Sequence, residues 1–179
     1  IMSPKFFLVS TCAICALVSV MTGSSWTTIA TIGMAFLGIG DALSVPNYWT
    51  AGAIISGAYF GDKISPLSDT TVLASSSAGV DLFSHIRYML YTTTPSMVIT
   101  LAIFFIAGFW FDGASVPNVS LYTDGLKSVF NISLWTLLVP LITAIMIYKK
   151  IPSLITLFVS ALVAGVMAVL MQSETLLEI

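Results

Sequence analysis

The stretch Gly57-Ala-Tyr-Phe-Gly-Asp-Lys-Ile-Ser-Pro-Leu-Ser-Asp-Thr-Thr71 decides how this chain is understood. From Gly61 onward it holds two carboxylates, one ammonium group and four hydroxyl groups, together with residues that interrupt helices. Alkali cations prefer oxygen ligands, which carboxylates, hydroxyls and freed carbonyls supply. The stretch therefore predicts either an ion site or an aqueous loop, and its composition alone favours neither.

The rest of the chain is unusually apolar. Of its 179 residues, 58% are hydrophobic and 8% are charged, and its mean hydropathy is +1.03. A soluble domain carries about 25% charged residues, so this chain cannot cover a globular surface and must meet lipid. The net charge of −2 and the lack of a basic stripe exclude a nucleic-acid partner.

Apolar segments predict an all-α, polytopic membrane protein with about five to seven transmembrane or re-entrant helices. A spanning helix needs about 20 mostly apolar residues, and several stretches approach this length. Two of them follow a proline or open on one, which suits the first turn of a helix. The predicted segments are Phe6–Met21, Thr27–Ile39, Tyr48–Phe60, Ser96–Phe111 (after Pro95), Ile132–Tyr148 and Pro152–Met171.

Two of these segments are predicted to be broken helices. Thr22-Gly-Ser-Ser25 interrupts the first apolar region, and Gly57, Gly61 and Pro66 interrupt the next. Backbone that leaves a helix at membrane depth must be buried in protein or line a cavity, because lipid cannot satisfy its amides. Short, interrupted hydrophobic segments of this kind indicate the binding site of a transporter.

The local geometry of the second break is also predicted. Ser65 is expected to cap a helix whose first residue is Pro66, which places Asp69 about one turn in. The segment Tyr48–Phe60 is expected to end at Gly61 with free carbonyls. One helix end would then offer partial negative charge and the next partial positive charge.

Other polar residues allow alternatives. Gly38-Ile-Gly-Asp41 matches the G-x-G-D form of intramembrane aspartyl proteases, with Asp62 as the second carboxylate, but the Tyr-Asp motif of presenilin-like enzymes does not precede it. Asp41 is therefore predicted to be an interfacial residue at a span end. His85 is either a proton relay or an interfacial residue, and Asp81 is predicted to cap a short helix.

The two cysteines, Cys12 and Cys15, form a C-x-x-C pair inside the first apolar segment. No second pair and no nearby His, Asp or Glu completes a metal or redox site. We predict that they are small packing residues and that the protein uses no cofactor.

Three stretches carry a family resemblance: Gly57 to Thr71, Ala78-Gly-Val-Asp-Leu-Phe-Ser-His-Ile-Arg87 and Tyr91-Thr-Thr-Thr-Pro95. They closely resemble the NhaC family of sodium/proton antiporters, and Thr22-Gly-Ser-Ser-Trp-Thr-Thr28 is similar to that family's upstream broken helix. The resemblance implies a secondary transporter rather than an enzyme. It implies exchange of Na⁺ for H⁺ across the cell's inner (plasma) membrane, with sodium-coupled malate/lactate antiport as the alternative.

The chain also departs from the family. Members often carry Asn and Pro after the position of Leu73, where this chain has Ala74-Ser-Ser-Ser77. Members are also more than twice as long, with two related halves. The resemblance therefore implies that residues 1–179 form a single transmembrane domain, the N-terminal half or a fragment of an inverted-repeat transporter whose second half is missing.

The resemblance and the polar cluster together predict the site residues and partners. Asp62 and Asp69 are expected to bind either Na⁺ or a proton, with Lys63 as charge partner. Asp41 and His85 are candidates for a proton relay. Expected partners are the lipid bilayer, Na⁺, H⁺ and, left open, further copies of the chain. The neutral oxygen ligands are expected from Ser65, Ser68, Thr70, Thr71, Ser25 and Thr28.

Overall fold

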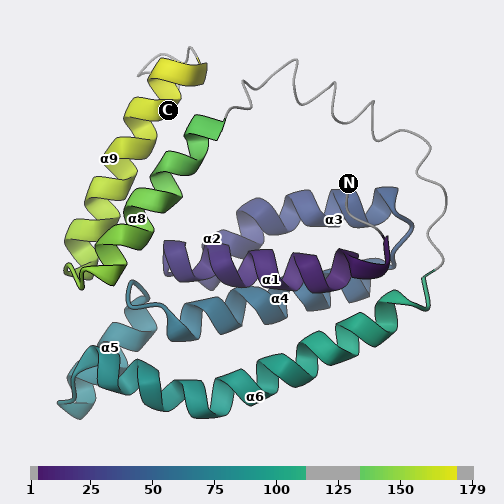
Figure 1. Ribbon diagram of the computed structural model, residues 1–179, viewed down its shortest axis with the longest axis horizontal. Coiled ribbons are helices and arrows are strands. Elements are labelled where there is room, and N and C mark those ends of the chain that lie inside the picture. The colour runs from purple at the N-terminus through teal and green to yellow at the C-terminus, as the bar shows by residue number, and fades with distance from the viewer. Residues whose placement is uncertain (1–3, 112–133, 173–179) are drawn as a thin grey trace. The chain divides into compact units, whose positions relative to one another are not determined.

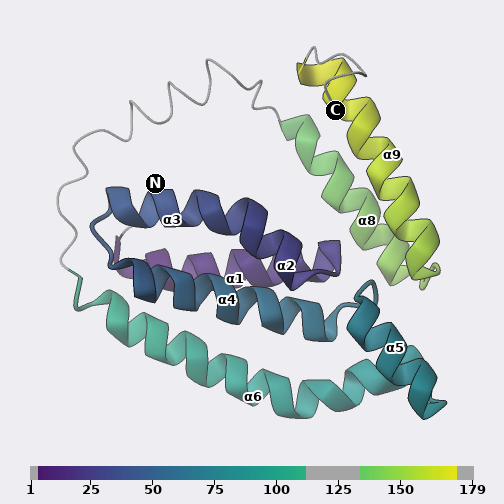
Figure 2. The ribbon, with the colours of Figure 1, turned by 180° about the vertical axis from the view of Figure 1, so that it is seen from behind.

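A computed structural model describes residues 4–111 and 134–172 of the protein. All regular elements in these residues are helical, as predicted. The chain divides into two compact units, Ile1–Val116 and Pro117–Ile179, and each is described by itself. Figures 1 and 2 show the helices of the first unit side by side from opposite directions. They are α1 (Pro4–Thr22), α2 (Ser25–Thr28), the π-helical turn η1 (Ile29–Gly33), α3 (Met34–Ala42), α4 (Asn47–Ile64), α5 (Asp69–Ala78) and α6 (Leu82–Gly108).

The first predicted break lies between α1 and α2. Gly23 has φ of +68°, a conformation that glycine adopts at little cost. Ser24 then caps α2, because its side chain accepts a hydrogen bond from the Thr27 amide. The chain continues through η1 into α3 as one helical stretch with a π-helical turn, a feature that is frequent at functional sites.

Helix α4 packs closely along α1, and two glycines permit this. A Cβ atom on Gly57 would overlap the Cys12 carbonyl, and one on Gly61 would overlap the Ala16 carbonyl. Small residues four apart are typical of helix pairs that approach closely in membranes. Both contacts advance by four residues on each helix, so α1 and α4 run parallel.

The prediction that Gly57 and Gly61 interrupt a helix is therefore wrong. Both lie inside α4, which ends at Ile64 rather than at Gly61. The physical reason is that these glycines serve contact between helices, not a change in backbone direction. Ser19 Oγ adds a hydrogen bond of 2.6 Å to the Ala58 carbonyl across the same pair of helices.

Helix α6 begins at Leu82, so the prediction that a span begins after Pro95 is wrong. Asp81 caps α6 by accepting a hydrogen bond from the Ser84 amide over 3.0 Å, as predicted, but the helix is long rather than short. Pro95 lies inside it and offers no N–H to the Tyr91 carbonyl. Neighbouring helices and hydroxyl side chains allow membrane helices to tolerate such a proline. Figure 1 shows α6 as a bent helix.

The second unit contains η2 (Leu134–Leu137, a 3₁₀ helix), α8 (Leu138–Tyr148) and α9 (Ser153–Gln172). Thr143 Oγ1 and Ser160 Oγ lie 2.7 Å apart and join α8 to α9. These helices match the last two predicted segments, except that residues 132 and 133 lie outside the described part of the chain.

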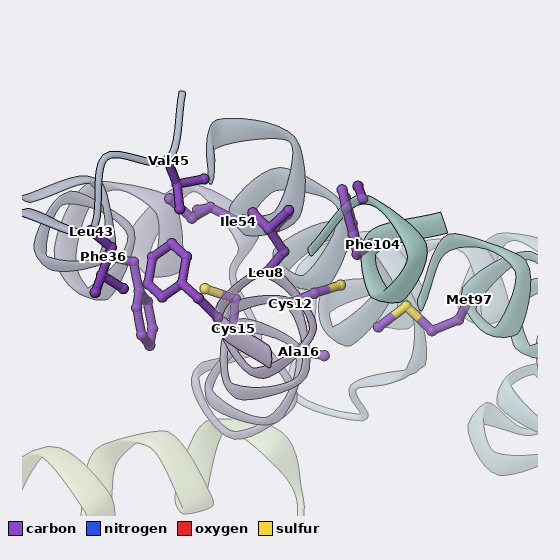
Figure 3. Close-up of a cluster of buried hydrophobic side chains, with 13 residues drawn as sticks. Leu8, Cys12, Cys15, Ala16, Phe36, Leu43, Val45, Ile54, Met97 and Phe104 are labelled. Atoms are coloured by element: carbon purple, nitrogen blue, oxygen red, sulfur yellow. The ribbon is translucent and has the colours of Figure 1, made fainter. Parts of the chain in front are cut away.

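The core of the first unit is a cluster of buried side chains from α1, α3, α4 and α6 (Figure 3). Phe7 and Leu8 of α1 are completely buried within it. Cys12 and Cys15 are also completely buried, and their sulfurs lie among these side chains. This agrees with their prediction as packing residues.

Three described helices are long and apolar enough to cross a membrane: Lys5–Thr22, Leu82–Gly108 and Leu154–Met171. Helix α4, which carries Asp62 and Lys63, is not among them. It packs instead against α1, α3 and α6. The protein is thus an all-α membrane protein in which the helix that carries Asp62 and Lys63 packs against three other helices of its own unit.

Candidate functional site

The two helix breaks lie against each other. Because α1 and α4 run parallel, their C-terminal ends, and the breaks that follow, share one end of the first unit. A Cβ atom on Gly23 would lie 2.6 Å from the carbonyl carbon of Leu67. Ser65 Oγ donates a hydrogen bond of 2.6 Å to the Val20 carbonyl. The structure therefore joins segments about 40 residues apart into one polar junction.

The second break has a different form from the predicted one. Ser65 does not cap a helix that begins at Pro66; its Oγ accepts a hydrogen bond of 3.1 Å from the Leu67 amide. Helix α5 begins only at Asp69, after Ser68 in extended conformation. The prediction was wrong because residues 65–68 form a turn, in which the Ser68 amide donates to the Ser65 carbonyl over 3.3 Å, before the helix begins.

Asp62 is the buried carboxylate of this junction. It is 8% exposed, and its Oδ2 accepts a hydrogen bond of 3.1 Å from Ser25 Oγ, which is itself buried. Its Oδ1 is buried and has no hydrogen-bond partner among the described residues. Buried polar oxygens are normally paired, and leaving one unpaired costs about 1–3 kcal/mol. Asp62 Oδ1 is therefore an open acceptor for a proton or a cation.

Other hydroxyls surround the junction. Thr28 is completely buried, and its Oγ1 lies 3.2 Å from Thr22 Oγ1 and donates to the Ser24 carbonyl over 2.9 Å. Thr71 Oγ1 lies 3.4 Å from the Asp62 carbonyl and 3.3 Å from the Lys63 carbonyl. Ser68 is buried and its Oγ lies 2.9 Å from Thr70 Oγ1. Thr71 thus adds a hydroxyl to two carbonyls at the end of α4, of which the Asp62 carbonyl also accepts from the Ser65 amide over 3.3 Å.

The remaining predicted site residues lie outside this buried group. Asp69 is exposed in the first turn of α5, where its Oδ1 accepts from the Thr70 amide over 2.8 Å. Lys63 and Asp41 are exposed, and His85 is half-buried on α6. The structure therefore brings Asp62 together with Ser25, while Asp69 faces outward.

The protease alternative requires Asp41 and Asp62 to share a proton. Asp41 lies near the end of α3, and α4 begins a few residues later at Asn47. Asp62 follows 15 residues further along α4, about 22 Å at the rise of an α-helix. The two carboxylates lie near opposite ends of α4.

Several polar residues of the junction were not predicted. Ser19 and Thr22 stand at the end of α1, where Ser19 bonds to α4 and Thr22 contacts Thr28. Their spacing of three residues in an apolar helix was the available signal. The described residues contain no group of three or more His, Cys, Asp or Glu side chains that could hold a metal ion.

The packing of Gly23 gives a testable expectation. Gly23 and Gly79 both have positive φ, but a Cβ on Gly23 would meet Leu67, whereas one on Gly79 would meet no atom within 4 Å. Gly79→Ala should cost about 1–2 kcal/mol from backbone strain alone. Gly23→Ala should cost clearly more and separate the two breaks. Thermal unfolding of the complete protein in detergent checks this, and equal midpoints for the two variants would contradict the contact.

Comparison with known proteins now gives the family. The sequence model of the Na⁺/H⁺ antiporter family matches residues 1–88 and 57–179. This chain belongs to the Na⁺/H⁺ antiporter family. The resemblance seen in the sequence is confirmed, and a transporter rather than an enzyme is the class that the family indicates.

Relatives of this antiporter-family chain include the Na(+)/H(+) antiporter NhaC of Alkalihalophilus pseudofirmus, 45% identical over 97% of the chain. The malate-2H(+)/Na(+)-lactate antiporter of Bacillus subtilis is 42% identical over 94% of the chain. The arginine/ornithine antiporter ArcD of Halobacterium salinarum is 36% identical over 99%. The chain spans 36–38% of the length of these relatives. No solved structure matches it.

Proposed function

We propose that the complete protein exchanges Na⁺ for H⁺ across the plasma membrane, with Asp62 as the carboxylate that holds either ion. The observation that carries this is the buried Asp62 side chain, with one oxygen on Ser25 and the other open, where two helix breaks meet. Family membership and the NhaC relatives support the same exchange.

The mechanism follows from competition at one carboxylate. When Asp62 is ionised, its open oxygen can bind Na⁺, and when it is protonated it cannot. Ser25 donates to the other oxygen and so fixes the carboxylate in the buried junction. Exchange follows if the site changes sides only with an ion bound, so that Na⁺ passes in one direction and H⁺ returns in the other.

Neutral oxygens from both breaks would complete the coordination. Ser25, Thr28 and Thr71 lie at the buried junction and are the neutral ligands we favour. Ser65 already donates to Val20 and accepts from Leu67, so its role is to hold the turn. Freed carbonyls at the ends of broken helices also serve as cation ligands in transporters.

The exposed residues receive different roles. We assign exposed Asp69, in the first turn of α5, the role of an outer carboxylate that attracts Na⁺ to the junction. Exposed Thr70 and buried Ser68 lie beside it as neutral oxygens. Lys63 is adjacent to Asp62 in sequence but exposed, and we assign it to the groove discussed below. We propose His85 and Asp41 as residues that transfer protons to or from the site. A second, similarly broken half and further copies of the chain remain the proposed protein partners.

The experiment is a measurement of sodium-dependent proton flux. Vesicles that contain the complete protein are loaded with acid, and a pH-sensitive dye reports proton efflux after Na⁺ is added outside. The proposal expects efflux that saturates with Na⁺ concentration. Vesicles without the protein give the background, and efflux at that level would overturn the proposal.

Ser25→Ala provides a specific prediction. It removes the donor to Asp62 Oδ2, an interaction worth about 1.5–3 kcal/mol when the acceptor is charged. We expect the half-saturating Na⁺ concentration to rise about tenfold or more. The control is Thr31→Val, which removes an exposed hydroxyl that donates to the Thr27 carbonyl of its own helical stretch over 2.7 Å. Equal Na⁺ dependence in the two variants would contradict the role of Ser25.

A second candidate function is sodium-coupled exchange of organic acids. The malate/lactate relative favours it, since it is as similar to this chain as the NhaC relatives. The same vesicles distinguish the two functions. Acid exchange requires an organic acid on the opposite side, whereas Na⁺/H⁺ exchange proceeds without one.

A further inference from the structure

A groove lies between α4 and α6, on a different face of α4 from the one that carries Asp62. Its volume is about 390 Å³, within the range of roughly 300–1,000 Å³ that is typical of small-molecule sites. Lys63 and Tyr59 belong to its α4 wall, and Thr92 and Ser96 belong to its α6 wall. Asp62 does not line it, and neither does any other carboxylate of the described residues.

The α6 wall offers hydrogen-bond acceptors. Thr93 Oγ1 donates to the Met89 carbonyl over 2.9 Å, and Ser96 Oγ donates to the Thr92 carbonyl over 3.0 Å. Thr92 Oγ1 and Thr100 Oγ1 donate to their own helix in the same way. Each hydroxyl proton is therefore used inside α6, and the lone pairs of the oxygens remain available to the groove.

The α4 wall offers donors. The side chains of Ser56, Tyr59 and Lys63, which line this wall, make no hydrogen bond or ion pair with another residue in the described part of the first unit. An ammonium group has three donors and no acceptor, and each hydroxyl still has its proton to give. One wall of the groove is thus cationic and donating, and the opposite wall is accepting.

We propose that this groove binds a small organic acid that carries a hydroxyl or amino group beside its carboxylate. The carboxylate would take donors from Lys63, Tyr59 and Ser56, because an ammonium group is a point charge suited to it. The neighbouring hydroxyl or amino group would donate to the oxygens of Thr93 and Ser96. This proposal deepens the second candidate function and does not depend on the role of Asp62.

The test is calorimetric titration of the purified complete protein with three four-carbon acids: 2-hydroxybutyrate, 2-aminobutyrate and butyrate. We expect at least one of the first two to bind at least about tenfold more tightly than butyrate, which has no group for the α6 wall. Lys63→Gln should weaken its binding by a similar factor. No binding of any of the three acids, or equal binding of all three, would overturn the proposal.

A pair of adjacent threonines gives the sharper control, and it also serves if Lys63→Gln does not fold. Thr93 lines the groove and Thr94 does not. Thr93→Val should reduce the preference over butyrate severalfold, whereas Thr94→Val should leave it unchanged. Equal effects of the two variants would overturn the proposal. Since calorimetry requires no ion gradient, failure to bind acids counts against the groove, and failure of flux counts against Na⁺/H⁺ exchange.

Discussion

Asp62→Asn should reduce sodium-dependent proton flux to the level of vesicles without the protein. The amide keeps the size of the side chain and can still bond to Ser25, but it can neither ionise nor carry the exchanged proton. Because the proposed exchange requires one carboxylate to hold either ion, no turnover should remain. The measurement is the dye-based efflux assay at several Na⁺ concentrations.

Two further variants show whether the effect is specific. Asp81→Asn changes a carboxylate that caps α6, and it should keep wild-type flux because asparagine caps helices as well as aspartate does. Asp69→Asn should keep the flux but require more Na⁺, since Asp69 is exposed. Wild-type flux in Asp62→Asn, or background flux in Asp69→Asn alone, would show that the buried carboxylate is not the central one.

Gly57→Leu should prevent α1 and α4 from packing. Its side chain would overlap the Cys12 carbonyl, which is backbone and cannot move aside without shifting the helix. Overpacking costs typically 1–3 kcal/mol even where side chains can adjust, and here the obstacle is the main chain. We expect most of the protein to be lost as aggregate during extraction, as measured by size-exclusion chromatography in detergent.

The matched control is Gly38→Leu. Gly38 lies inside α3, and a Cβ there would meet no atom within 4 Å in the described part of the chain. Both variants change helix propensity in the same direction, because leucine favours helices over glycine. A monodisperse Gly57→Leu protein that retains flux would contradict the close contact of α1 and α4, and with it the meeting of the two breaks.

Much of the fold follows from the sequence. The low charge and the apolar segments predicted an all-α membrane protein, and the sequence around Gly23 predicted the first break. The predicted capping role of Asp81 was confirmed. The errors occurred where glycine and proline can have more than one structural role. Gly57 and Gly61 serve contact with α1 rather than a break, and Pro95 lies within a long helix.

The candidate site was harder to predict in detail. Ser25 and Asp62 were both predicted, but so was Asp69 with equal weight, because burial depends on which face of α4 or α5 meets another helix. The parallel packing of α1 and α4 places Asp62 inside, and that packing is a contact between distant segments. The row of hydroxyls on α6 could have been predicted, because Thr92, Ser96 and Thr100 are four residues apart and so share one face of a helix.

The central claim is that Na⁺ and a proton compete for Asp62, and proton release on Na⁺ binding tests it most directly. The purified complete protein is held in weakly buffered detergent solution below the pH at which its flux is greatest. Adding NaCl, with choline chloride as the control for ionic strength, should release protons from the wild-type protein and none from Asp62→Asn. Equal release from both proteins would contradict the claim.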